Sequence, residues 1–148
     1  MASKGEEELR QLAVEQRLLE QTADALQSRM NMVNAVVTDL TYASMALEGL
    51  EKEKENSELL VPIGGGSYVK AKLGTPDRVI VSVGAGVSVE KTVQEAKEIV
   101  KKRLEDLGKT RMSLQQQFSQ VVGKINENRQ KLDQLVANMR QEKTSADV

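Results

Sequence analysis

Two long segments of the chain repeat apolar residues at alternating intervals of three and four. The first runs from residue 9 to residue 47, and ten of its twelve repeat positions are apolar. The second runs from residue 93 to residue 139, and eleven of its fourteen positions are apolar. Spacing of this kind, sustained over about six heptads, is typical of coiled-coil helices. We therefore predict two long helices, at about residues 6–54 and 93–141.

Both predicted helices have a start signal, and neither contains proline. Ser3 stands three residues before Glu6 and Thr92 three residues before Glu95, which are two capping-box patterns. Gly108 and Gly123 weaken the second helix by roughly 1 kcal/mol each relative to alanine. They mark either bends or places where the helices approach closely.

The two predicted helices are equally long and are joined by a short middle segment, so they can fold back as an antiparallel coiled coil. Leu47 would then lie near Val93, and the two chain ends would meet. The apolar residues expected at that meeting point are Leu9, Leu12, Leu135, Val136 and Met139. Two fraying helix ends cannot bury all of them. They therefore form either a binding surface or a loosely packed end.

The middle segment, about residues 58–91, has the pattern of four short strands. Gly64-Gly65-Gly66 and Gly84-Ala85-Gly86 are turn signals, which divide it into two β-hairpins. So short a segment cannot enclose a core of its own, and its strand edges are open. Strands from other subunits could close it into a barrel, so we predict that this hub is a subunit interface. Its apolar contact residues would be Val61, Ile63, Val69, Leu73, Val79, Val81, Val83 and Val87.

These elements predict a mainly α protein with a small β hub, folded as one domain over residues 1–148. The composition narrows its function. Twenty-one basic and 22 acidic residues give a net charge of -1, which attracts neither nucleic acid nor an anionic membrane strongly. The chain has no cysteine and no histidine, so thiol nucleophiles and the commonest general base are missing. We expect no enzymatic activity, no metal and no cofactor.

A glycine-containing turn and a seam asparagine resemble functional motifs but have simpler interpretations. Gly84-Ala85-Gly86 follows a strand, yet Val89 stands where a dinucleotide-binding fingerprint needs its third glycine, and no βαβ unit surrounds it. Tight hairpin turns explain these glycines better. Asn128 falls on the apolar seam, where a polar residue commonly sets coiled-coil register.

No targeting or membrane segment is apparent in the sequence. The first eight residues are acidic and lack an apolar run. The uncharged stretches at 59–69 and 79–89 are too short for a membrane span, which needs about 20 apolar residues. We expect a soluble protein of the cytoplasm.

The order helix, two hairpins, helix resembles an α-class prefoldin subunit of the archaeal type. The most specific part of the resemblance lies in two hub motifs, LLVPIGGGSYV at residues 59–69 and VIVSVGAGVSVE at residues 79–90. Two hairpins are the α-class feature, because β-class subunits have one. The resemblance covers nearly the whole chain.

The resemblance implies an ATP-independent co-chaperone. Two α and four β subunits would form a hexamer, with the hairpins building a barrel platform from which coiled-coil arms project. The arm tips would hold unfolded proteins and deliver them to a group II chaperonin. By position, the client-contact residues would be Leu9, Leu12, Leu135, Val136 and Met139, and the subunit contacts would be the hub residues given above. A structural scaffold without client-holding activity is the alternative, although it does not need the two hairpins.

Overall fold

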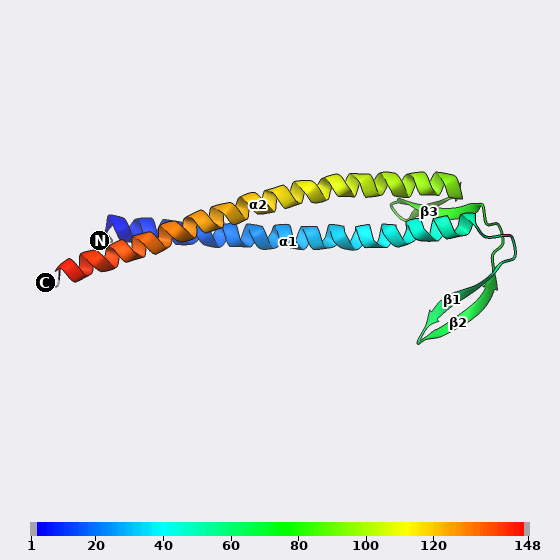
Figure 1. Ribbon diagram of the computed structural model, residues 1–148, viewed down its shortest axis with the longest axis horizontal. Helices are drawn as coiled ribbons and strands as arrows, with labels where there is room; N and C mark the ends of the chain where they lie inside the picture. The colour runs from blue at the N-terminus through cyan, green and yellow to red at the C-terminus, as the bar shows by residue number, and fades with distance from the viewer. Residues whose placement is uncertain (1–2, 147–148) are drawn as a thin grey trace. The chain divides into compact units, whose positions relative to one another are not determined.

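The computed structural model describes residues 3–146, which form two long helices joined by two β-hairpins (Figure 1). Along the chain the elements are α1 (Lys4–Glu51), β1 (Glu58–Gly64), β2 (Ser67–Lys72), β3 (Arg78–Gly84), β4 (Val87–Thr92) and α2 (Val93–Ala146). The predicted fold class, mainly α with a small β hub, is confirmed. The chain divides into two compact units. The terminal unit comprises the described residues 3–34 and 109–146, and the hub unit comprises residues 35–108.

In the terminal unit, the first part of α1 packs against the last part of α2. Leu26 and Met30 of α1 share a buried cluster with Leu114 of α2. Nearer the chain ends, a β-carbon placed on Gly5 would lie 3.8 Å from the Sδ atom of Met139. Residue numbers therefore rise along one helix as they fall along the other, and the pairing is antiparallel, as predicted.

In the hub unit, the end of α1 packs against the start of α2. The buried members of this core are Leu47, Val93, Ala96 and Val100. The prediction that Leu47 lies near Val93 is confirmed. Lys97 also occupies a heptad position, and its ammonium nitrogen lies 3.1 Å from both carboxylate oxygens of Glu51. This ion pair explains how a lysine is accommodated beside the seam.

The heptad pattern correctly identified the packed face of both helices. All twelve predicted positions in α1 are buried or half-buried. The same holds for the predicted positions in α2, except that Arg111 is exposed. A long flexible side chain can leave the seam and keep its charge in water, which the apolar residues around it cannot do.

The two hairpins are structural repeats of each other, offset by twenty residues. β1 pairs with β2 so that Glu58 faces Lys72, and β3 pairs with β4 so that Arg78 faces Thr92. All other paired residues follow the same offset. The register shift next to each turn does so too, since it lies between Pro62 and Gly64 in the first hairpin and between Ser82 and Gly84 in the second. The turns match as well, since Gly65 has φ of 57° and Ala85 has φ of 51°. Each hairpin forms its own two-stranded sheet.

Both helix starts are capped as the capping-box patterns predict. The backbone nitrogen of Glu6 donates to Oγ of Ser3 at 3.1 Å, and that of Glu95 donates to Oγ1 of Thr92 at 3.1 Å. The helices accordingly begin at Lys4 and Val93. The first helix ends at Glu51, before the position expected from the sequence. The backbone nitrogens of Lys52 and Glu53 bond to the carbonyl oxygens of Gly49 and Leu50, three residues back, and Asn56, with φ of 66°, then turns the chain into β1. The second helix continues to Ala146, five residues beyond the expected end.

Gly108 and Gly123 lie within α2 without close neighbours. A β-carbon placed on either residue would meet no other atom within 4 Å among the residues that the structure describes. Close helix approach is therefore not the reason for glycine at these two positions.

Candidate interaction surfaces

The apolar residues expected at the chain ends line a groove in the terminal unit. Leu9 of α1 faces it together with Leu135, Val136 and Met139 of α2. The groove has a volume of about 880 Å³, and each of these four side chains is half-buried. Leu12 is also half-buried but does not line the groove. The structure thus brings together four of the five predicted residues.

Polar groups of both signs surround this groove. Its charged lining residues are Lys4, Glu6, Arg140, Glu142 and Lys143. Because three basic and two acidic residues line the groove, no single charge dominates it. The groove can therefore accept apolar side chains, and its rim does not select a ligand of one charge.

The first hairpin leaves its apolar side chains uncovered. Val61, Ile63 and Val69 are exposed by 41%, 64% and 48%. Apart from the half-buried Ala71, every residue of β1 and β2 is exposed. Uncovered apolar residues on a two-stranded hairpin are costly in water, and such a hairpin is at best marginally stable alone. We therefore expect this hairpin to contact another molecule.

The second hairpin is seated on the helices of its own chain. Val79 and Val81 pack against the core that contains Leu47 and Val93. The guanidinium of Arg103 in α2 also donates to the carbonyl oxygen of Ser82 at 2.7 Å, which ties β3 to the helix.

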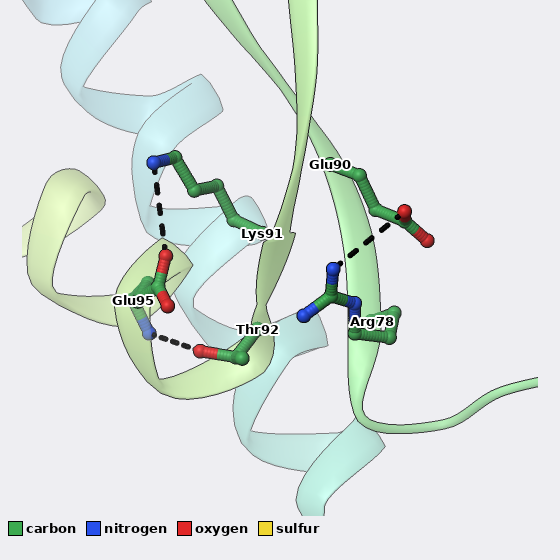
Figure 2. A network of polar contacts seen from close by, with 5 residues as sticks. All are labelled: Arg78, Glu90, Lys91, Thr92 and Glu95. Carbon is green, nitrogen blue, oxygen red and sulfur yellow. Dashed lines mark hydrogen bonds and ion pairs between the residues drawn. The ribbon is translucent and has the colours of Figure 1, made fainter.

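Polar contacts fasten the base of this hairpin to the start of α2. Figure 2 shows Arg78 and Glu90 paired across β3 and β4, with 3.7 Å between nitrogen and oxygen. In the same view, the carboxylate of Glu95 lies 3.7 Å from the ammonium of Lys91, while its backbone nitrogen bonds to Thr92. The backbone nitrogen of Val93 also donates to the carbonyl oxygen of Asp77 at 2.9 Å.

The eight predicted hub residues therefore have different surroundings. Val79 and Val81 are half-buried by their own chain, which the strand pattern alone could not reveal. Leu73 is half-buried, whereas Val83 and Val87 are exposed. Sequence reasoning also left out four exposed apolar residues of the hairpins: Leu59, Leu60, Tyr68 and Ile80. The twenty-residue repeat is a signal for two of them, because it aligns Leu60 with Ile80.

Within the described residues, no group of three or more histidine, cysteine, aspartate or glutamate side chains is arranged to hold a metal ion. Neither α1 nor α2 combines the length and apolar character that a membrane-crossing helix needs.

Comparison with known proteins identifies the class to which this fold belongs. A protein-family description, "Prefoldin subunit", matches residues 19–141. Prefoldin subunit alpha of Methanococcoides burtonii is 38% identical over 109 residues, covering 74% of this chain and 79% of the relative. Prefoldin subunit alpha of Methanobrevibacter smithii is 33% identical over 131 residues, covering 86% of this chain and 89% of the relative.

A solved structure has the same fold. The cryo-EM structure of a filamentous PFD from Methanocaldococcus jannaschii matches with a TM-score of 0.66 at 26% identity, over 75% of this chain and 92% of that chain. The chain belongs to the prefoldin family, and the resemblance to α-class archaeal subunits is confirmed.

Proposed function

We propose that this chain is the α-class subunit of a co-chaperone that captures unfolded proteins without ATP and delivers them to a group II chaperonin. The observation that carries the proposal is the apolar groove at the chain ends, lined by Leu9, Leu135, Val136 and Met139. An unfolded chain exposes apolar side chains of many shapes. A shallow apolar groove between charges of both signs suits such a ligand, because it imposes little sequence preference.

The expected strength of each contact agrees with a holding role. Burying one leucine-sized side chain contributes about 1.5–3 kcal/mol, so a single groove would bind a client weakly. Several grooves on one assembly would bind the same client together, which raises avidity without any one strong site. Binding to the unfolded state alone withdraws it from aggregation by mass action, so capture requires no nucleotide.

Holding by several grooves requires an assembly, and the first hairpin supports one. Its apolar residues Val61, Ile63 and Val69 stay exposed among the residues that the structure describes. We propose that these residues contact β-class prefoldin subunits, with two α and four β chains in a hexamer located in the cytoplasm. Val83 and Val87 would extend the same contact, since both are exposed.

The proposal is tested by capture and transfer. The chain is assembled with a β-class subunit, its mass is measured by light scattering, and a labelled denatured protein is added without nucleotide. We expect the client to migrate with the complex and then to move to an added group II chaperonin. A complex with the mass of the hexamer that does not retain the client would instead support the scaffold alternative. A chain that assembles with no β-class subunit would contradict the proposed partnership.

A further inference from the structure

The seam of the terminal unit contains two amide side chains that lack complete hydrogen bonding. Asn128 of α2 is 6% exposed, and its Nδ2 donor has no partner among the described residues. Gln16 of α1 is half-buried, and its Oε1 acceptor is also buried without a partner among them. One residue thus has an unused donor and the other an unused acceptor. A buried polar atom is costly to leave without a partner.

The helix register places these two residues opposite each other. Leu9 and Leu135 line the same groove, and Met30 and Leu114 share one core cluster. Gln16 lies one heptad inward from Leu9, just as Asn128 lies one heptad inward from Leu135. Two further heptads along each helix lead to Met30 and Leu114. In this antiparallel pair, Gln16 and Asn128 therefore belong to the same layer.

The neighbouring layers are apolar. Leu12 and Leu132 come next on the side of the chain ends, and Leu19 and Ile125 come next on the other side; all four are half-buried. An amide in such a position has few alternative partners. The side chain across the seam offers a complementary group at the same level.

The two amides are not hydrogen-bonded to each other in this structure. We infer that rotation of their side chains closes a hydrogen bond between Gln16 and Asn128 across the seam, and that this polar layer determines which helices pair and in which register. Leucine-rich heptads are permissive, because one apolar layer fits another almost equally well after a shift or with a helix of a second chain. A matched amide pair is satisfied in one register and leaves two buried polar groups unpaired in the others. The layer would thus favour pairing of each helix with its own partner. This inference does not depend on the proposed function.

A disulfide reporter tests the inference directly. The chain has no cysteine, and Gly5 lies beside Met139, so Gly5→Cys with Met139→Cys should form a disulfide within one chain. Its equilibrium constant is measured in a glutathione buffer on the full chain. Gln16→Leu and Asn128→Leu are made singly and together in this background. Gln130→Leu, which changes an exposed amide two residues from Asn128, is the matched control.

We expect each single leucine substitution to lower the equilibrium constant roughly fivefold, because it leaves the opposite amide unpaired. The double substitution should recover most of this loss, and Gln130→Leu should have no effect. After unfolding and refolding at high concentration, the double variant should also form more disulfides between chains than the parent does. The swapped variant, Gln16→Asn with Asn128→Gln, keeps one amide on each helix. It should have the parent's equilibrium constant and the parent's proportion of interchain disulfides, which separates loss of pairing from a general folding defect.

Two outcomes would overturn the inference. Effects of the single substitutions that simply add in the double variant would show that the two amides do not interact. An unchanged proportion of interchain disulfides in the double variant would show that the layer has no role in the choice of partner helix.

Discussion

Val61 and Val81 occupy equivalent positions in the two hairpins but have different surroundings. Each is paired across its hairpin with another valine, Val61 with Val69 and Val81 with Val89. Val61 is 41% exposed, whereas Val81 packs against the helix core that contains Leu47. The same strand pattern is repeated after twenty residues. In the second hairpin it packs against the chain's own core, and in the first hairpin it forms an exposed surface.

This difference predicts opposite effects for the same substitution. Val61→Asp should abolish assembly with β-class subunits, yet leave helicity and the thermal midpoint of the isolated chain nearly unchanged. Val81→Asp should lower the free energy of unfolding by about 2 kcal/mol or more, because it places a charge against the helix core. Light scattering measures the first effect, and circular dichroism during thermal unfolding measures the second.

The two hairpin variants act as controls for each other. If Val61→Asp leaves the mass of the complex unchanged, the first hairpin is not the assembly surface. If Val81→Asp leaves the thermal midpoint unchanged, the packing of the second hairpin on the helices contributes little to stability.

The helix glycines offer a stabilising change. Gly108→Ala and Gly123→Ala should each raise the free energy of unfolding, by up to about 1 kcal/mol, because both positions are helical and an added β-carbon meets open space. Gly64→Ala is the contrasting substitution, since φ there is 103° and a side chain would strain the turn. Denaturant unfolding of the three variants tests this. Loss of stability on either helix substitution would indicate a structural need for glycine.

The cap at the start of α2 should contribute measurably to stability. Thr92→Ala removes the hydroxyl that accepts the backbone N–H of Glu95, which typically costs about 1 kcal/mol. Thr92→Ser keeps a hydroxyl and should be nearly neutral. Ser3→Ala removes the corresponding cap of α1 at the chain end, where fraying reduces the loss. Equal melting of Thr92→Ala and Thr92→Ser would contradict the role assigned to this cap.

Much of the fold follows from local sequence rules. The heptad positions identified the packed face of both helices, the capping boxes identified their starts, and the glycine turns identified both hairpins. These features depend on residues close together in sequence. The meeting of Leu9 with Leu135 was predicted for a related reason, because antiparallel pairing of equal helices brings the two chain ends together.

What the sequence could not reveal depends on contacts between distant elements. The strand pattern is the same in both hairpins, so it could not show that Val79 and Val81 pack on the helices while Val61 does not. The bond from Arg103 to the Ser82 carbonyl likewise joins two elements that have no common sequence signal. Gln16 and Asn128 were recognisable as polar seam residues, but their unpaired atoms required three-dimensional packing.

We propose that the groove lined by Leu9, Leu135, Val136 and Met139 holds unfolded proteins through apolar contacts. Charge offers no alternative explanation, because residues 1–20 have five acidic and three basic side chains and residues 124–148 have four and five. An apolar interaction should persist at high salt, whereas an exposed charge interaction is screened. Replacing Leu135, Val136 and Met139 with serine should weaken holding without changing the mass of the complex. The loss should be partial, because the β-class arms still contribute.

The most direct measurement is suppression of aggregation of a denatured protein by the assembled complex, without nucleotide, at about 0.05 M and about 0.5 M salt. The matched control replaces Met32, Tyr42 and Met45 with serine; these three exposed residues lie outside the groove. We predict that the parent and the control complexes suppress aggregation at both salt concentrations. The complex with serine at positions 135, 136 and 139, the groove variant, should suppress less aggregation at both. Equal suppression by the parent and the groove variant, or loss of the parent's activity at high salt, would contradict the account.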